Sequence, residues 1–134
     1  ALKSAAARGV DVRLLLPEVN NHVYTGLASK ALYEELLAAG IRIFERKPPF
    51  MHAKAMLIDN RAALVGSANF DMRSLRLNYE SNLLVFDSEF VGRLDKIIRA
   101  DFAQSREINA RDWNQRKLWH KILENLCYLM MPIL

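Results

Sequence analysis

Residues 52–69 read HAKAMLIDNRAALVGSAN, two short apolar runs on either side of a turn-like DNR triplet. Apolar runs of this length, bounded by turn residues, predict strands at 52–58 and 62–65. Side chains on a strand repeat every two residues, so His52 and Lys54 should point to the same face. This stretch therefore predicts an imidazole beside an ammonium group on one side of a strand.

Strand and helix signals alternate on both sides of this stretch. Apolar runs and alternation predict further strands at 10–16, 41–47 and 79–86, the second with one covered face. Helical spacing and glycine stops at Gly9 and Gly40 predict helices at 2–8, 24–39 and 88–104, with a single helical turn at 71–75. This order predicts an α/β fold in which helices sandwich a mixed sheet, over residues 1–108.

Residues 109–134 form a tail with a different pattern. From 112 to 131 the apolar residues share one side of a predicted helix that Pro132 ends. His120, Lys121, Glu124 and Asn125 occupy the other side. Two interpretations stay open: the helix docks on the body of the protein, or it lies on anionic lipid.

Length and composition set outer limits. The 134 residues are 51% hydrophobic and 25% charged, which is ordinary globular usage, and no apolar run reaches the ~20 residues that cross a bilayer. The net charge of +4 is compatible with an anionic partner. The single cysteine, Cys127, excludes an internal disulfide and fits a reducing compartment. Because the chain begins without Met and without a strand before its first helix, we expect a fragment of something longer.

The small-residue loop 66–69 adds chemistry to the histidine and lysine. Its Ser67 hydroxyl and Asn69 carboxamide can donate to one anion, and Lys54 supplies a point charge suited to phosphate. Glu80 opens the next predicted strand, where it could accept from Nδ1–H of His52 and leave Nε2 free.

These residues carry a resemblance to a known family. The pattern H-x-K-x4-D-x6-G-S-x-N resembles the signature of the phospholipase D superfamily; it is filled by His52, Lys54, Asp59, Gly66, Ser67 and Asn69. The surroundings are similar to bacterial cardiolipin synthases, in residues 9–17, 33–45, 66–87 and the tail from 105 onwards. The resemblance covers nearly the whole chain.

The resemblance implies phosphatidyl transfer through a phosphohistidine, with two histidines from two motifs acting in turn. It assigns the general acid and base to His52, stabilisation of phosphoryl oxygens to Lys54, Asn69 and Ser67, and the orienting carboxylate to Glu80. Asp59 belongs to the motif, although a turn role suits it better. No cofactor or metal is expected, since no histidine, cysteine or carboxylate cluster has ligand spacing.

The same resemblance predicts the partners. They are an anionic phospholipid substrate, a membrane surface, and either an N-terminal half with the first motif or a second copy of this chain. It also implies the cytoplasmic face of the bacterial inner membrane. Nucleic acid is not expected, because aromatic and basic residues are not interleaved along one groove.

Two alternatives remain beside the phosphatidyltransferase. One is a phosphodiesterase or nuclease assembled as a homodimer of one-motif chains. The other is a catalytically silent half that serves as a membrane-binding or assembly module.

Overall fold

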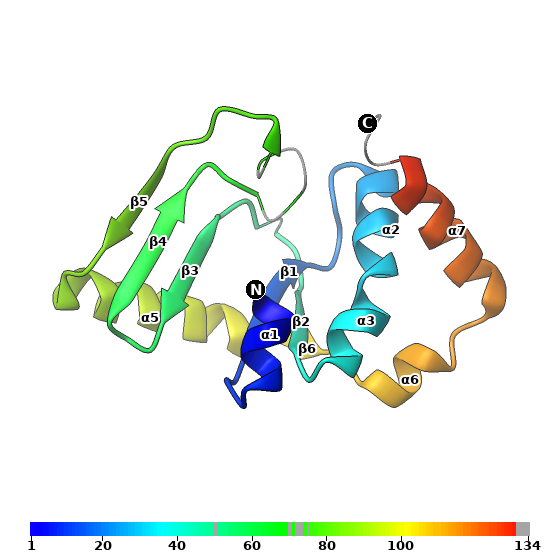
Figure 1. Cartoon of the computed structure of the whole chain (residues 1–134), viewed down its shortest axis with the longest axis horizontal. Helices are drawn as coiled ribbons and strands as arrows, with labels where there is room; N and C mark the ends of the chain where they lie inside the picture. The colour runs from blue at the N-terminus through cyan, green and yellow to red at the C-terminus, as the bar shows by residue number, and fades with distance from the viewer. Residues whose placement is uncertain (50, 70, 72–73, 75, 131–134) are drawn as a thin grey trace. The chain divides into compact units, whose positions relative to one another are not determined.

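A computed structural model describes residues 1–49, 51–69, 71, 74 and 76–130 of the chain (Figure 1). The chain forms two compact units: Ala1–Met51 with Gln104–Leu134, and His52–Ala103. Each unit contains one three-stranded sheet. The predicted α/β class is thus confirmed, with the strands divided between two sheets.

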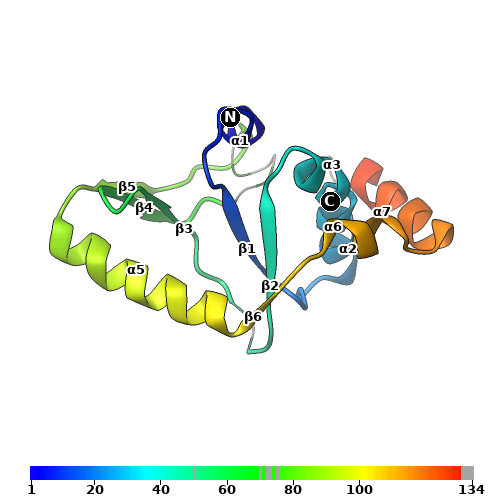
Figure 2. The ribbon, with the colours of Figure 1, turned by 90° about the horizontal axis from the view of Figure 1, so that it is seen from below.

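The first unit contains a mixed sheet with β2 at its centre. β1 (Arg13–Pro17) pairs in parallel with β2 (Arg42–Arg46), and β6 (Ser105–Glu107) pairs antiparallel with β2 on its other side. The helices α2 (Val23–Ala31) and α3 (Tyr33–Ala38) make the crossover that a parallel pair requires. In Figure 2 these two helices lie on the same side of the sheet as α6 (Ala110–Asn114) and α7 (Leu118–Met130).

Glycines end two helices of this unit as predicted. Gly9 follows α1 (Leu2–Ala7) with φ of +88°, and Gly40 follows α3 with φ of +83°. After α3 the amide of Gly40 donates to the carbonyl of Leu37, and the amide of Ile41 donates to that of Leu36. These two bonds define a Schellman motif, whose left-handed residue glycine adopts without steric cost.

The core of the first unit is a small apolar cluster. Tyr33, Ile43 and Ile108 are buried together, and partly buried side chains from α3, β1 and α6 pack around them. The predicted one-sided exposure of strand 41–47 is wrong, because Glu45 is only 1% exposed. A central strand has both faces covered, and the buried carboxylate pairs with Arg106 at 2.9 Å.

The second unit contains an antiparallel sheet and one long helix. β3 (Ala55–Ile58), β4 (Ala62–Gly66) and β5 (Asn82–Val85) follow in that order across the sheet. The helix α5 (Ser88–Ala103) lies along one face of this sheet (Figure 2), and its Val91 is 1% exposed. The predicted strand 62–65 and helix 88–104 are confirmed within one residue.

The strands predicted at 52–58 and 79–86 are shorter in the structure, at Ala55–Ile58 and Asn82–Val85. Three further predicted elements differ from the structure. The helix predicted at 24–39 is divided at Leu32, after a turn in which the Ser29 hydroxyl donates to the Thr25 carbonyl and competes with the helical bonds. The tail helix predicted at 112–131 is two helices, α6 and α7, and its last predicted residue lies outside the described part of the chain. The helical turn predicted at 71–75 lies mostly outside the described residues.

Candidate active site

All six predicted site residues belong to the second unit, within or next to the sheet β3–β4–β5. His52 and Lys54 lie just before β3 rather than inside it. The carbonyl of Lys54 nevertheless accepts from the Gly66 amide at 3.1 Å, which continues the pairing of β3 with β4 by one residue. The backbone carrying the ammonium group is therefore held by the sheet.

The imidazole and the ammonium group are in direct contact, as the two-residue spacing predicts. Nζ of Lys54 lies 2.8 Å from Nε2 of His52 and donates to the His52 carbonyl at 2.9 Å. An ammonium group can only donate, so Nε2 acts as the acceptor in this contact. Nε2, which the sequence analysis expected to be free, is thus engaged by Lys54.

Ser67 joins the loop after β4 to the segment before β5. Its hydroxyl donates to a carboxylate oxygen of Glu80 at 2.5 Å and accepts from the Ser81 amide at 3.0 Å. Its own amide donates to the Ser81 carbonyl at 3.0 Å. The Ser67 hydroxyl therefore donates its proton to Glu80 in this structure. Through these bonds Ser67 links the loop after β4 to the segment before β5.

Electrostatics around Glu80 favour its charged form. The hydrogen bond from Ser67 is the largest of the effects that hold the pKa of the Glu80 carboxyl below its ordinary value. Ser74, Asn78 and the positive charge of Lys54 act in the same direction, while desolvation opposes them. Glu80 is thus an anion that lies within the electrostatic reach of Lys54.

Close packing at position 66 explains why the loop after β4 begins with glycine. A Cβ at this position would lie 2.3 Å from the Ser81 carbonyl oxygen and 2.7 Å from the Asn82 Cα. Contacts under 3.0 Å are essentially never observed for a real Cβ, and both of these atoms belong to the backbone of the neighbouring strand segment. Only a hydrogen atom fits, so the close approach that lets Ser67 reach Glu80 depends on Gly66.

The other two predicted residues lie at different places. Asp59 and Asn60 have φ of +48° and +54° in the turn between β3 and β4, closed by the Arg61 amide donating to the Ile58 carbonyl. Two consecutive positive φ angles are typical of hairpin turns, so Asp59 has the turn position that the sequence analysis preferred. Asn69 is exposed in the loop after β4, where its carboxamide is accessible to a ligand.

Sequence reasoning missed three residues around Glu80. Ser81 fixes the position of Ser67, and Asn78 donates to Glu80 at a long 3.5 Å. Ser74 is buried, and its side chain also lowers the pKa of Glu80. No spacing in the sequence distinguishes these residues from ordinary loop residues.

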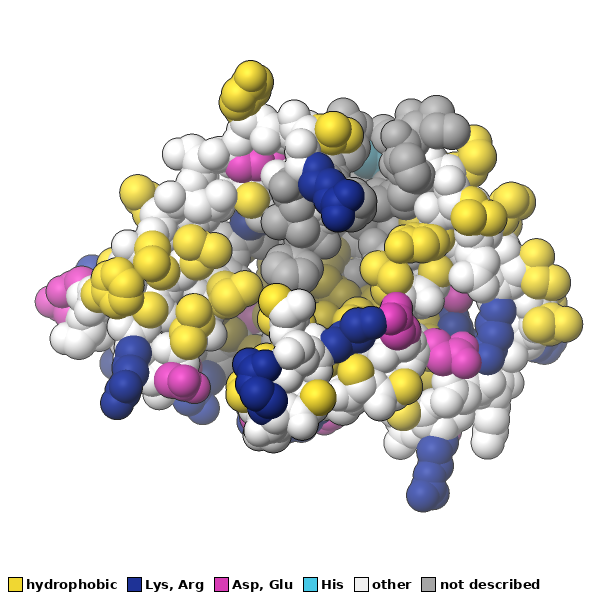
Figure 3. Space-filling view, viewed as in Figure 1, with side chains coloured by type: hydrophobic (Ala, Val, Ile, Leu, Met, Phe, Trp, Pro, Cys, Tyr) yellow, Lys and Arg dark blue, Asp and Glu magenta, His cyan; other side chains and the backbone are white. Residues whose placement is uncertain are grey.

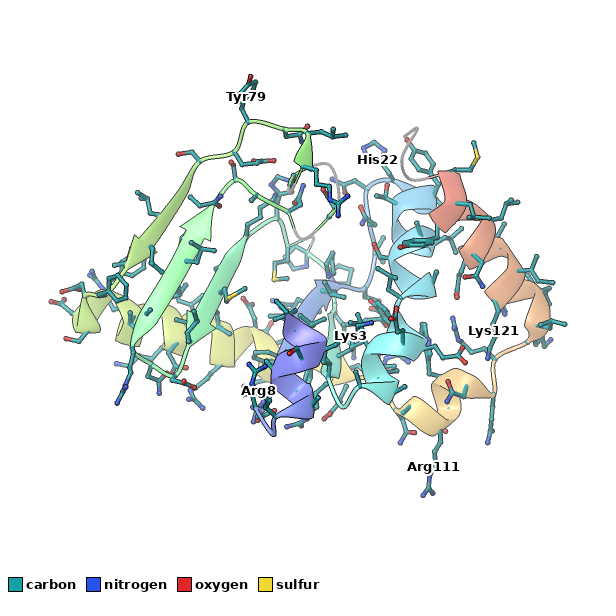
Figure 4. The ribbon with its side chains drawn as sticks, viewed as in Figure 1. Lys3, Arg8, His22, Tyr79, Arg111 and Lys121 are labelled. Atoms are coloured by element: carbon teal, nitrogen blue, oxygen red, sulfur yellow. The ribbon has the colours of Figure 1, made fainter. Side chains whose placement is uncertain are left out.

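His22 lies outside this constellation. It precedes α2 in the first unit (Figure 4), is exposed, and stacks on Tyr24 with ring centroids 5.7 Å apart. Across the residues that the structure describes, no group of three or more histidine, cysteine or carboxylate side chains could hold a metal ion. Over the same residues, no helix has the length and apolar character needed to span a membrane.

The arrangement is suited to chemistry on an anionic, oxygen-rich group. Nε2 of His52 can accept or donate a proton, and Lys54 places a positive charge beside it. The loop donors follow directly from β4, the central strand of the sheet. A model of the family described as "Cardiolipin synthase, PLD-like domain" matches residues 1–102. The chain belongs to this family.

Individual relatives agree with this membership. Cardiolipin synthase A of Pectobacterium carotovorum is 42% identical over all 134 residues of the chain, which correspond to 28% of that relative's length. The cardiolipin synthases A of Citrobacter koseri and Klebsiella pneumoniae have the same identity and coverage. The chain therefore spans little more than a quarter of the curated relatives that it matches.

A solved structure supports the fold independently. The crystal structure of Nuc from Salmonella typhimurium, a phospholipase D family member, matches with a TM-score of 0.67. The match covers 80% of this chain and 70% of that chain at 22% identity. At this identity the likeness concerns the fold alone, which is that of the phospholipase D family.

Proposed function

We propose that this chain supplies one half of the active site of a phosphatidyltransferase that makes cardiolipin from phosphatidylglycerol or a related phosphatidyl donor. The observation that carries the proposal is the contact of Lys54 with Nε2 of His52, next to the anchored Ser67–Glu80 pair. This arrangement lies in a chain that belongs to the cardiolipin synthase-type family.

The first step forms a covalent intermediate. A histidine of the other half attacks phosphorus, a nitrogen–phosphorus bond forms, and the bond to the glycerol headgroup breaks. His52, carrying a proton on Nε2, gives that proton to the leaving glycerol oxygen. Lys54 turns from the imidazole to the phosphoryl oxygens as they enter, and Asn69 donates to the same oxygens.

The second step reverses the proton transfer. The hydroxyl of a second phosphatidylglycerol attacks phosphorus while His52 accepts its proton, and the nitrogen–phosphorus bond breaks. The products are cardiolipin and glycerol, and both histidines return to their starting states. The second step needs Nε2 as a hydrogen-bond acceptor, which is the role that a contact with the Lys54 ammonium gives it.

Ser67 and Glu80 have a positioning role in this proposal. The negative charge of Glu80 lies within reach of Lys54 and balances it, and Ser67 fixes the carboxylate by its hydroxyl. In a second candidate arrangement, Glu80 contacts His52 only when substrate has drawn Lys54 away. In both arrangements Glu80 acts through His52 or Lys54 and not on the substrate.

The surface of the second unit supports the proposal of a half-site. Leu83 and Leu84 of the edge strand β5 are 70% and 54% exposed, although neighbouring residues point to opposite faces of a sheet. Figure 3 shows hydrophobic side chains gathered over this sheet. An apolar edge of this kind suits coverage by a partner, either a half with the first motif or a second copy of this chain.

Because the proposed substrates and product are membrane phospholipids, we propose that the reaction takes place at the cytoplasmic face of the bacterial inner membrane. The chain would be peripheral there.

An exchange experiment tests the proposed function. In cardiolipin synthase A of Pectobacterium carotovorum, the aligned segment is replaced by this chain, and the hybrid enzyme is incubated with phosphatidylglycerol vesicles. We expect cardiolipin and glycerol by mass spectrometry, unaffected by a metal chelator. Since general acid–base catalysis contributes about 10²–10⁴-fold, His52→Ala should lower the rate at least about a hundredfold.

The matched control is His22→Ala, which removes an exposed histidine of the first unit and should leave the rate nearly unchanged. An inactive hybrid that folds, or equal rates for the two alanine variants, would contradict the proposal.

A further inference from the structure

The helix α7 packs on the first unit with its polar side. Glu124 is 4% exposed and pairs with Arg116 at 2.5 Å, while Nζ of Lys121 reaches Glu34 of α3 at 3.1 Å. Figure 4 shows Lys121 directed from α7 toward the body of this unit, and α7 lies against α2. The residues that contact the body are therefore those that an ordinary surface helix turns to solvent.

The opposite side of α7 is apolar and exposed. The outer face of α7, as we define it, consists of residues that are 56–72% exposed: Leu118, Trp119, Ile122, Leu126 and Leu129. Hydrophobic side chains follow α7 along its outer edge in Figure 3. An amphipathic helix normally buries its apolar stripe, so this orientation leaves a continuous apolar strip that the unit itself does not cover.

The charges near the outer face are complementary to an anionic surface. Glu124, the one carboxylate of α7, is buried, so the exposed side of the helix carries no negative charge. Lys117 immediately precedes the helix and is exposed. An apolar strip that lacks exposed acidic residues and has a basic residue at its end suits a helix that lies in the interface of an anionic bilayer.

One aromatic residue of the outer face fits the same surface. Trp119, near the beginning of α7, is 56% exposed. Tryptophan combines an apolar ring with a polar tip and favours the level of lipid headgroups.

We propose that the outer face of α7 rests on a bilayer that contains anionic phospholipid. The choice of lipid over a protein partner rests on the proposed function, whose substrate is a bilayer phospholipid. The helix carries its polar contacts inward to keep the first unit attached, and it presents its apolar side to the acyl chains. Lys117, directly before the helix, then lies near the phosphates.

Vesicle binding by this chain tests the proposal without any turnover. We expect co-sedimentation with phosphatidylglycerol/phosphatidylcholine vesicles and weaker binding to phosphatidylcholine alone. Ile122→Gln and Leu126→Gln should each weaken binding about tenfold, given the free energy of burying one such side chain. Both positions are exposed, so the variants should keep the wild-type circular dichroism spectrum.

The matched control is Ile97→Gln on α5, where an isoleucine is 60% exposed against 59% for Ile122. It should bind vesicles like the wild type. Equal binding by wild type, Ile122→Gln and Leu126→Gln would overturn the proposal. So would variants that lose self-association in the absence of vesicles while keeping vesicle binding, because the face would then belong to a second copy.

His52→Ala separates this inference from the proposed function. It should bind vesicles as the wild type does, because α7 and not the active site holds the bilayer. Binding that depends on His52 and not on Ile122 would overturn the inference. If the hybrid enzyme makes no cardiolipin but vesicle binding still depends on Ile122, the proposed function is contradicted and the inference about α7 is not.

Discussion

Gly66→Ala should destabilise the second unit by separating β4 from the segment before β5. A Cβ at Gly66 would lie 2.3 Å from the Ser81 carbonyl oxygen, and this distance must grow beyond 3.0 Å. That movement breaks the bond from the Ser67 amide to the Ser81 carbonyl and the bond from the Ser81 amide to the Ser67 hydroxyl, both 3.0 Å long. Overpacking costs about 1–3 kcal/mol and each of the two lost bonds about 1 kcal/mol, so we expect a loss of roughly 3–5 kcal/mol.

The assay is urea unfolding followed by circular dichroism, with Gly92→Ala as the matched control. Gly92 lies inside α5, and a Cβ there would meet nothing within 4 Å. Because alanine is the better helix former, this second variant should gain about 0.5–1 kcal/mol. The two glycine-to-alanine changes therefore have opposite signs. A Gly66→Ala protein as stable as the wild type would refute the reasoning.

Three polar contacts can be tested by single substitutions. Ser67→Ala should raise the pKa of Glu80, because the Ser67 hydroxyl is the main cause of its lowering; NMR titration of the carboxyl measures this, and an unchanged titration contradicts it. Because folding lowers this pKa, Glu80 adds to the free energy of unfolding at pH values above its unfolded-state pKa, and this contribution is lost as the pH falls through the folded-state pKa. The Ser67→Ala variant should therefore lose less stability on acidification than the wild type. Arg116→Met leaves the buried Glu124 unpaired and should cost about 3–5 kcal/mol in urea unfolding, most of it recovered by adding Glu124→Leu; equal losses in both proteins would exclude the buried charge as the cause. Asn109→Ala removes the side chain that accepts from two backbone amides of α6 and should cost about 1 kcal/mol, whereas Asn109→Asp should keep the cap; thermal unfolding distinguishes them, and equal melting of both variants contradicts the capping role.

The features that the sequence predicts well depend on local chemistry. Gly9 and Gly40 end helices through bonds within one turn, and Asp59 lies in a turn that its neighbours define. The contact between His52 and Lys54 also follows from their two-residue spacing. In each case the interacting groups are separated by only a few residues, so the local sequence is enough to predict the contact or turn.

The features that the sequence did not predict depend on distant partners. Glu45 is buried because Arg106, from a strand 61 residues later, neutralises it. The hydroxyl of Ser67 turns to Glu80 across 13 residues, in competition with a role on the phosphate. The orientation of α7 depends on the pair of Arg116 and Glu124, which draws the polar side inward. The periodicity of the sequence indicates which side of a helix is apolar. It does not indicate which side packs on the body of the protein, because that depends on ion pairs with distant residues.

The most direct test of the central claim is the reaction of the hybrid enzyme with a phosphatidyl ester of p-nitrophenol, a leaving group that needs no protonation. If His52 is the general acid and base, the His52→Ala hybrid should fail on phosphatidylglycerol and still release p-nitrophenolate in a burst stoichiometric with enzyme. It should then stop, because no base activates the acceptor alcohol. Absence of the burst would mean that His52 itself forms the covalent bond, and full turnover of phosphatidylglycerol by the variant would mean that His52 has no part in the chemistry.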